Sequence, residues 1–348
     1  MFMSSYGDLL RKSRNAGPLY APTPFWEAAT DRLVDDIKRD GIKNFRNRGA
    51  PLSFFVPTYG FPGNSLSPEQ ITALESVAGS FSSKQQAMVE AWVSGAAHAL
   101  SDYRAFMAAT RTGSARRLLA FSEDYAGNPL EQFKFDDRNY SRSALNYLMG
   151  LTFLAEHIDL NKIGTVLEIG GGFGTLGEIL VKCWPLGTVK YIDLDIPPGC
   201  QFTDYYLSQA CAKTTRMQST ESVELDRIEI DELPTLSILP NWKIEAIEGD
   251  IDLFVNFISF QEMEPEVVRN YLNHVQRLQS KWIMLRNMRE GKQKRIKAGG
   301  IGVNQPILGD DYDLMLSGYE VVARDTTVFG CRTSDGFHSD LVLYKRRQ

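Results

Sequence analysis

A short apolar segment that runs directly into a glycine-rich turn is the feature of this sequence that most restricts its fold. Thr165–Ile169 has the composition of a buried strand, and the following residues, Gly170 to Gly177, form the turn and open a helix. Because glycine has no Cβ atom, such a turn lets the backbone approach a ligand closely at the carboxyl end of a strand. Open α/β sheets bind their ligands at that edge, so the segment predicts an α/β sheet with a ligand site.

Short apolar runs alternate with helical segments through the rest of the C-terminal half, which is the pattern of a parallel sheet wrapped by helices. Two last strands are joined by a short connection, so they are expected to form an antiparallel pair. The predicted fold class is therefore α/β, with five parallel strands, a sixth strand and a final antiparallel strand in a Rossmann-like, seven-stranded sheet. The strands are expected at residues 165–169, 189–194, 235–239, 253–257, 282–285, 319–325 and 339–344.

Residues 1–160 are predicted to form a helical N-terminal domain and residues 161–348 the sheet domain, which agrees with a length of 348 residues. A capping box with proline at the first helical position, Ser67-Pro68-Glu69-Gln70, starts one helix. A second, long helix is expected from Ser83 to Ala109, and Ser141 opens a third that reaches about His157.

Charge and cysteine content exclude several classes of protein. The 38 basic and 43 acidic residues give a formal net charge of −5, so the chain lacks the basic surface that the nucleic-acid backbone requires. The four cysteines form no Cys-x-x-Cys pair and are too few for a disulfide framework. Neither a secretory signal nor an apolar stretch of about 18 residues is found. We therefore expect a cytoplasmic protein with no nucleic-acid partner, no membrane partner and no metal site.

The glycine turn predicts a nucleoside-containing cofactor without identifying it. Gly170, Gly172 and Gly174 are candidates for contact with the cofactor, but Gly172-x-Gly174-x-x-Gly177 is also the dinucleotide fingerprint. Glycines alone therefore do not separate S-adenosylmethionine (SAM) from NAD. Glu168, two residues before the first glycine, gives the spacing Glu-x-Gly-x-Gly-x-Gly and is a further cofactor-binding candidate. The structural alternative is a turn needed only to pack the helix on the strand.

Two acids at the end of the second predicted strand are candidates for binding a ribose. Asp193 and Asp195 follow the glycine turn by about 20 residues and lie on one strand face. A carboxylate at this position can accept hydrogen bonds from both ribose hydroxyls, in SAM as well as in NAD. One of the two is expected to be only a solvated or turn-capping residue, and we favour Asp195 because it stands just before the Pro197-Pro198 stop.

Polar residues gather where the fourth predicted strand ends. Asn256, Ser259, Gln261 and Glu262 follow or end the apolar run Leu253–Phe257. Polar groups in a cleft need partners, and a cofactor or substrate would supply them, so Asn256, Ser259 and Gln261 are cofactor-binding candidates. The alternative is that Ser259 or Gln261 starts and caps the following helix.

These three segments together resemble a known family. Glu168-Ile-Gly-Gly-Gly-Phe-Gly, the strand end Asp195-Ile-Pro-Pro and Asn256-x-x-Ser259-Phe260-Gln261-Glu262-Met263 are similar to bacterial sugar O-methyltransferases of the class I SAM-dependent superfamily. The resemblance covers about Phe121 to Tyr344. It implies the seven-stranded class I methyltransferase sheet, SAM as cofactor with the acid Glu168 near its methionine portion, and a small-molecule acceptor such as a sugar hydroxyl.

Two residues are candidates for removing a proton from an acceptor hydroxyl. Glu262 is the first, either as the base or as a ligand of the acceptor. His338 is the second, because the connection between the sixth and seventh strands is expected at the carboxyl edge and an imidazole is well matched to neutral pH. A loop histidine that faces solvent is the alternative for His338.

The charged segments of the sequence do not decide the chemical class of the acceptor. The basic run at residues 286–297 is a candidate site for a phosphate of a nucleotide sugar, with a mobile basic surface loop as the alternative. The acidic residues Glu123, Asp124, Glu131 and Asp136 could instead line a lid for a cationic acceptor. The acids at Asp310, Asp311 and Asp313 are expected to open a helix rather than to bind a metal.

The first hypothesis is a SAM-dependent methyltransferase that acts on a sugar hydroxyl, with the helical N-terminal domain covering the active site and supplying acceptor contacts or a homodimer surface. The runner-up is N- or O-methylation of an amino-acid-like compound, such as arginine or another guanidine, or of a natural product. Two hypotheses from other functional classes stay open: an NAD-dependent oxidoreductase and a SAM-binding scaffold protein without catalytic activity.

Overall fold

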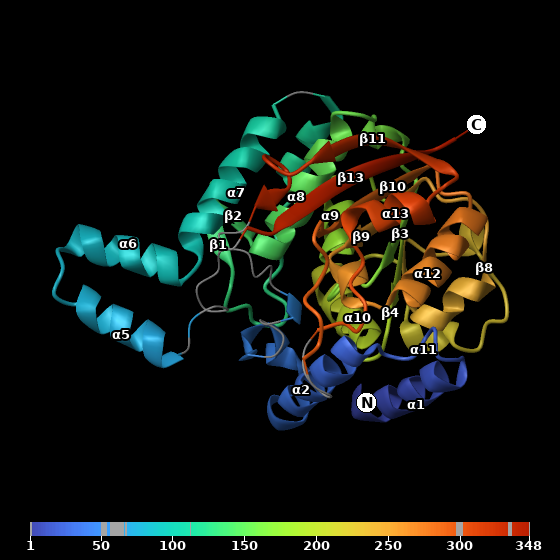
Figure 1. Ribbon diagram of the computed structural model, residues 1–348, viewed down its shortest axis with the longest axis horizontal. Helices are drawn as coiled ribbons and strands as arrows, with labels where there is room; N and C mark the ends of the chain where they lie inside the picture. Colours follow the sequence, from blue (N-terminus) through green and yellow to red (C-terminus); the bar gives the residue numbers. More distant parts are fainter. Residues whose placement is uncertain are drawn as a thin grey trace.

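The computed structural model describes residues 2–49, 54–55, 66, 68–111, 113–296, 302–332 and 336–347. In this part of the chain a central sheet has the strand order β11-β13-β10-β9-β3-β4-β7-β5, and β12 pairs with β13 at one end (Figure 1). The strands of this sheet are β3 Thr165–Ile169, β4 Lys190–Asp195, β5 Arg216–Met217, β7 Leu236–Pro240, β9 Leu253–Phe257, β10 Trp282–Met288, β11 Tyr319–Asp325, β12 Cys331–Arg332 and β13 His338–Arg346.

The predicted fold class is confirmed. β7, β4, β3, β9 and β10 run parallel, and β13 is antiparallel to both β10 and β11, as expected for the last strand. All five residues of β9 are buried, which is typical of a parallel strand covered on both faces. In the described residues, the central sheet contains two short strands, β5 and β12, besides the seven predicted ones.

Helices cover both faces of the sheet because successive strand residues point to opposite sides. On β3, Val166 belongs to the hydrophobic cluster beneath α8, α9 and α10, whereas Leu167 belongs to the cluster beneath α12. These helices are α8 Arg142–Ala155, α9 Thr175–Cys183, α10 Gly199–Ala210, α11 Ser219–Ser222, α12 Pro265–Arg277 and α13 Gly309–Met315. The short elements between them are η3 Leu160–Lys162, β6 Ile228–Glu229, η4 Ile230–Glu232, η5 Asn241–Ala246, β8 Ile247–Glu248 and η6 Ser259–Glu262.

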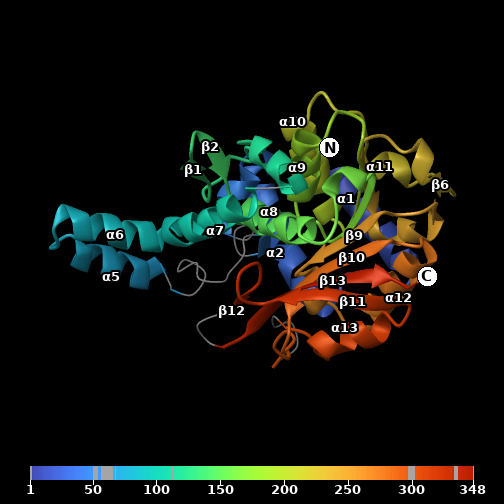
Figure 2. The ribbon, with the colours of Figure 1, turned by 90° about the horizontal axis from the view of Figure 1, so that it is seen from above.

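The N-terminal region is helical, as predicted, but the long helix expected at residues 83–109 is wrong. Gly95 adopts a left-handed conformation, with φ of 82°, and separates two helices there. Figures 1 and 2 show α5 and α6 side by side, projecting away from the sheet, with α7 leading back to it. The N-terminal elements are α1 Phe2–Asn15, α2 Pro24–Asp40, η1 Ile42–Asn47, α5 Pro68–Ala78, α6 Ser83–Val93, α7 Ala96–Ala109 and η2 Gly113–Ala120.

The acidic segment before α8 contains a hairpin that the sequence did not predict. β1 Phe133–Phe135 pairs with β2 Arg138–Tyr140, and Asp136 and Asp137 form the turn with φ of 46° and 62°. Ser141 then caps α8, since its side chain accepts a hydrogen bond from the backbone N–H of Ala144.

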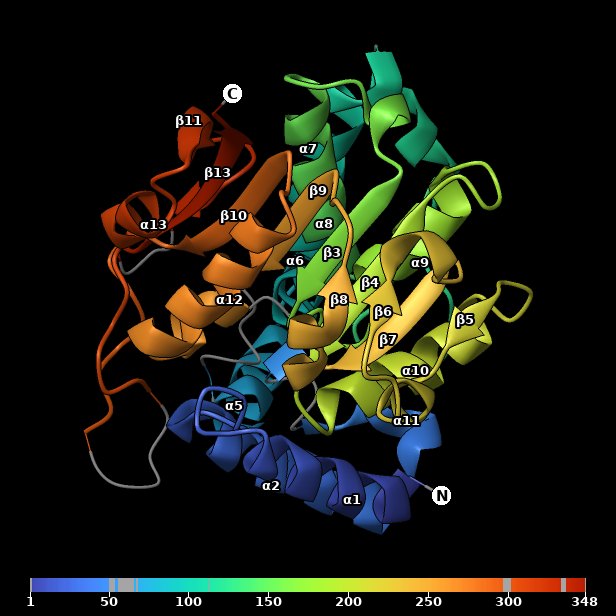
Figure 3. The ribbon, with the colours of Figure 1, turned by 90° about the vertical axis from the view of Figure 1, so that its right-hand side faces the viewer.

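Figure 3 shows the sheet strands fanned between the helices of its two faces. Within the described residues, no helix has both the length and the apolar character that a membrane span requires.

Candidate active site

A cavity of about 1520 Å³ lies at the carboxyl edge of the parallel strands. Its wall includes Gly170 after β3, Asp195 at the end of β4, Ser259 after β9 and Met288 at the end of β10. The strand order reverses at β3, with β4 on one side and β9 on the other, so this edge is the topological switch point of the sheet. The cavity therefore lies where the glycine turn predicts a ligand site.

The three candidate glycines divide into two roles. Gly170 and Gly172 line the cavity with φ of 72° and 69°, and a Cβ atom on Gly170 would lie 2.4 Å from Oγ of Ser259. Gly174 instead begins α9, and a Cβ atom there would lie 2.9 Å from Cγ2 of Thr203. Gly174 is thus required for helix packing, and only the first two glycines leave backbone exposed to a ligand.

Glu168 lies behind the glycine turn rather than in the cavity wall. Its side chain is fully buried, and Tyr147 and Tyr191 donate hydrogen bonds to its two oxygens at 2.6 and 2.5 Å. Burial, together with the charge of Asp193, raises the pKa of Glu168 to about 8. Tyr147 does line the cavity, and its ring stacks on Phe257 with the centroids 4.9 Å apart. Glu168 therefore orients a residue of the wall.

The two candidate ribose acids occupy different environments. Asp193 is fully buried behind the turn, where Oδ1 accepts a hydrogen bond from the N–H of Gly171, and burial raises its pKa to about 7. Asp195 lines the cavity, while its Oδ1 accepts the N–H of Ile196 at 2.7 Å. Burial and then the charge of Asp193 raise the pKa of Asp195. Asp195 thus accepts the backbone N–H of the next residue and also faces the cavity, which Asp193 does not.

The segment after β9 is held against the glycine turn by side chains. Asn256 donates to the carbonyl oxygen of Ile169 at 2.9 Å and accepts the N–H of Phe260, so it fastens the strand end and does not line the cavity. Ser259 also donates to Ile169 and lines the cavity. Gln261 lines it too, with Oε1 accepting the N–H of Met288 at 2.7 Å.

Ile258, between these residues, has φ of 75° and ψ of −36°, which is strained for a β-branched side chain. It also lines the cavity. A strained backbone of this kind persists only where the surrounding structure holds it in place, and it occurs often at functional sites.

The predicted base Glu262 lies in the cavity wall and is paired. Its Oε1 is 2.9 Å from Nζ of Lys292, which also lines the cavity and lies 5.0 Å from the centre of the Phe25 ring. Burial raises the pKa of Glu262, and the charge of Lys292 opposes this shift. Its carboxylate is therefore a stronger base than that of an ordinary glutamate.

The basic run at residues 286–297, which begins on β10, divides between wall and surface. Arg286 is buried in the wall, donates to the carbonyl oxygen of Phe329 and lies over the Phe257 ring at 5.3 Å. Arg289 instead forms an ion pair with Asp340 at 2.9 Å. Lys297 lies outside the described residues.

His338 is not among the residues that line the cavity. Its Nδ1 lies 2.6 Å from Oε1 of Glu290, and its backbone N–H donates to the same carboxylate. The neighbouring residue Phe337 is the one that reaches the wall.

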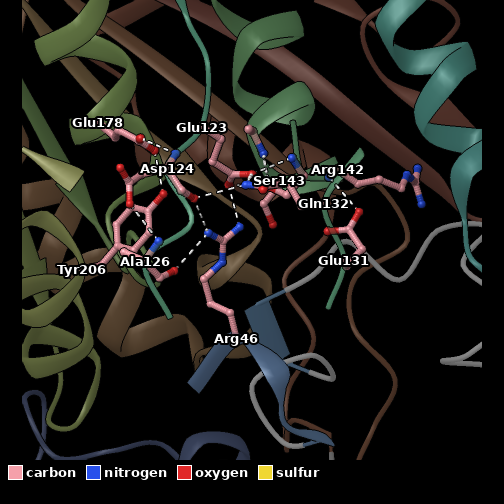
Figure 4. A network of polar contacts seen from close by, with 12 residues as sticks. Arg46, Glu123, Asp124, Ala126, Glu131, Gln132, Arg142, Ser143, Glu178 and Tyr206 are labelled. Carbon is pink, nitrogen blue, oxygen red and sulfur yellow. Dashed lines mark hydrogen bonds and ion pairs between the residues drawn. The ribbon is translucent and has the colours of Figure 1, made fainter. Parts of the chain in front are cut away.

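Of the acidic residues before α8, Glu123 and Glu131 hold the start of that helix, and none of Glu123, Asp124, Glu131 and Asp136 is among the lining residues. Figure 4 shows Arg46 donating to Glu123. The carboxylate of Glu123 also accepts the N–H and the hydroxyl of Ser141. Glu131 accepts the N–H of Arg142 at 2.8 Å, and burial raises the pKa of Glu131 to about 8. Within the described residues, no group of three or more His, Cys, Asp or Glu side chains could hold a metal ion.

Asn241, directly after β7, is a cavity residue that the sequence analysis missed. It is buried, and Nδ2 donates to the carbonyl oxygen of Tyr20 and to the hydroxyl of Tyr271, both at 2.8 Å. Its Oδ1 is buried without a hydrogen-bond partner among the described residues. The signal was a polar residue directly after a predicted strand, the same signal that identified Ser259.

The N-terminal helices complete the wall with residues that carry no recognisable motif. An aromatic group from this region, Phe25, Trp26 and Phe54, has ring centroids 5.6 to 6.2 Å apart. The polar residues that α7 and α8 add to the wall are His98, Ser101, Asp102, Arg142, Ser143 and Asn146.

Comparisons with known proteins add little to this description. No model of a known protein family matches the chain, and no curated protein matches it. The mitomycin 7-O-methyltransferase MmcR is 13% identical with a TM-score of 0.37, covering 95% of this chain and 69% of that one. The magnesium protoporphyrin IX methyltransferase ChlM of Synechocystis PCC 6803, crystallised with SAM, is 13% identical with a TM-score of 0.36, covering 59% and 81%.

The PH0226 protein of Pyrococcus horikoshii OT3 is 12% identical with a TM-score of 0.41, covering 60% of this chain and 92% of that one. Identities of 12 to 13% with TM-scores below 0.5 show no function for this chain.

Proposed function

We propose that this protein is a SAM-dependent methyltransferase that acts on a hydroxyl group of a small molecule. The observation that carries the proposal is the arrangement of Gly172, Asp195 and Asn241 around one cavity at the switch point of the sheet. The antiparallel strand β13 between β10 and β11 supports SAM over NAD, because the methyltransferase resemblance implies this sheet and an ordinary dinucleotide domain does not.

The residues present fit the parts of this cofactor. The buried Oδ1 of Asn241, without a partner among the described residues, can accept a hydrogen bond from an adenine amino group. The carboxylate of Asp195 can accept hydrogen bonds from ribose hydroxyls. Gly172 presents backbone to the cavity, and a Cβ atom there would lie 3.5 Å from Cδ1 of Phe55, at the edge of ordinary contact. These three residues would hold SAM.

Bound SAM supplies a methyl group on a positively charged sulfur, and an acceptor hydroxyl that takes it must lose its proton. Glu262 can accept this proton from the wall of the cavity, since burial favours its protonated form. Lys292 holds the carboxylate in one orientation before the reaction and can stabilise its charge.

A sugar hydroxyl is the acceptor that we propose first, in agreement with the family resemblance. Methylation of a cationic amino-acid-like compound has less support, because Glu123, Asp124, Glu131 and Asp136 are not among the lining residues. A hydroxyl on an aromatic natural product is the second candidate, favoured by the cluster of Phe25, Trp26 and Phe54 in the wall.

The test is release of S-adenosylhomocysteine (SAH) from SAM in the presence of free sugars, nucleotide sugars, phenols and amino acids including arginine. Turnover on sugars or phenols is the expected result and identifies the acceptor class. Thermal stabilisation by SAH but not by NADH should accompany it. Stabilisation by NADH alone would overturn the proposal in favour of an oxidoreductase, and binding of SAH without turnover of any acceptor would favour a scaffold.

A further inference from the structure

We propose that the cavity face of α7, together with the start of α8, is the acceptor-binding subsite, and that His98 binds a hydroxyl of a polyhydroxylated acceptor such as a sugar. This inference rests on the proposed function and adds to it the residues that select the acceptor.

One face of α7 is turned to the cavity. The residues of α7 that line it include His98, Ser101, Asp102 and Ala105. The last three follow His98 by three, four and seven residues, which places all four on a single side of the helix. The polar groups on this face can therefore meet a ligand together, as convergent polar groups do in small-molecule sites.

His98 has an unused hydrogen-bonding atom on this face. Its Nδ1 is buried and has no hydrogen-bond partner within the described part of the chain. Burial lowers the pKa of His98, the charge of Arg142 lowers it further, and the charge of Asp102 opposes this. The imidazole is thus neutral near pH 7. A hydroxyl both donates and accepts hydrogen bonds, so it can pair with Nδ1 in either tautomer.

The neighbouring polar groups are held in fixed positions. Arg142 donates through Nε and Nη2 to Oδ2 of Asp102, both at 3.1 Å, and this pair joins α8 to α7. The backbone of Arg142 is fixed in turn by Glu131, as Figure 4 shows. A subsite whose groups are already ordered loses little conformational entropy when a ligand binds.

The same wall extends towards the cofactor side of the cavity. Arg286 on β10 and Cys331 on β12 line the same cavity as Asp102 and Arg142.

Aromatic surface lies in the same cavity as these polar groups. Trp92, one helix before His98, lines it with 42% of its surface exposed. Convergent hydrogen-bonding groups beside an amphipathic ring suit a ring compound with several hydroxyls better than a flat hydrocarbon.

The experiment compares His98→Leu, which removes the hydrogen-bonding atom, with His98→Asn, which keeps an amide in reach of the same position. His157→Leu is the matched control, because His157 is exposed and is not among the lining residues. Each SAH-saturated protein is titrated with UDP-glucose, methyl α-glucopyranoside and catechol, with tryptophan fluorescence as the readout, and SAH affinity is measured separately.

We expect His98→Leu to weaken binding of one of the two sugar probes about tenfold, which is the loss of one hydrogen bond to a buried group. SAH affinity should stay unchanged, His98→Asn should recover part of the sugar affinity, and His157→Leu should behave as wild type.

Equal sugar affinity in wild type and His98→Leu would overturn the inference, as would wild-type protein that binds SAH and catechol but neither sugar. Failure of the wild-type protein to bind SAM or SAH would instead overturn the proposed function, so the two failures are distinguishable.

Discussion

Glu168 stands at the position where the sequence motif suggests an acid that contacts the cofactor, yet both of its oxygens accept hydrogen bonds from buried tyrosines. One of these, Tyr147, reaches the cavity and stacks on Phe257. The acid therefore influences the cavity through a neighbour. A motif records the spacing of residues, whereas the direction of a side chain depends on the partners that the fold places beside it.

Replacing Gly172 with valine should remove cofactor binding. Its φ of 69° is unfavourable for a residue with a Cβ atom by about 1–2 kcal/mol, and the new side chain would occupy space beside the cavity wall. We expect SAH affinity to fall about a hundredfold or more in calorimetric titration. Gly187→Val is the control, because Gly187 has φ of 74° and, among the described residues, no atom lies within 4 Å of its Cβ position. An equal loss of SAH affinity in both variants would contradict this prediction.

Glu262→Gln should leave SAH binding intact and lower turnover. The amide keeps the shape of the carboxyl group but cannot take a proton, so kcat should fall by about 10²-fold or more. The control is Glu264→Gln, because Glu264 accepts the N–H groups of Asn304 and Gln305 and is not among the lining residues. Full activity in Glu262→Gln would remove Glu262 from the mechanism.

At the scale of elements, the strands were predicted well because their apolar runs are local signals. β3 and β9 have the predicted ends, whereas β4 and β7 are each shifted by one residue. The helix expected at residues 83–109 was wrong because its periodicity continues across Gly95, and a single glycine inside a helical pattern only weakens a prediction.

The candidate site was predictable where residues follow a strand directly. Asp195, Ser259, Gln261 and Glu262 lie in the wall for this reason. His98 and its neighbours on α7 were missed, because their position at the cavity depends on how the N-terminal helices pack on the sheet. No spacing in the sequence encodes that packing.

Glu131, which fixes the start of α8, should make stability depend on pH. In the unfolded chain the carboxyl group of Glu131 loses its proton near the ordinary glutamate pKa of about 4.3, whereas in the folded chain it keeps that proton to about pH 8. Between these values the folded state binds more protons, so this residue lowers the free energy of unfolding as pH rises, by up to about 1.4 kcal/mol per unit. Glu131→Gln should remove this contribution.

Urea unfolding at pH 5.5, 6.5 and 7.5 measures the effect. The free energy of unfolding of Glu131→Gln should increase relative to that of wild type at each step to higher pH. Glu75→Gln, at an exposed position on α5, should show the same pH dependence as wild type. A constant difference between Glu131→Gln and wild type across the three values would refute the assignment.

At the scale of the whole molecule, one hydrophobic cluster joins the two predicted domains. Leu9, Leu33 and Phe106 from the N-terminal helices belong to the same cluster as Val255 and Leu341 of the sheet. The division at residue 160 stays a prediction, but a shared core of this kind favours unfolding in one step.

We therefore expect one calorimetric transition in which the helical region and the sheet unfold together. SAH at a hundred times its Kd should raise the free energy of unfolding of the whole chain by about 2.7 kcal/mol. Far-UV circular dichroism and tryptophan fluorescence should report the same midpoint. Two separate transitions, only one of them shifted by SAH, would show that the domains are independent.

Two distant parts of the chain form the wall of the cavity. One part is the glycine turn with the strand ends, and the other is the face of α7. Of the α7 residues that face the cavity, His98 and Ser101 belong to neither hydrophobic cluster, so exchanging these two should cost little stability. A combinatorial library confined to His98 and Ser101 would therefore sample new acceptors on an unchanged cofactor-binding frame.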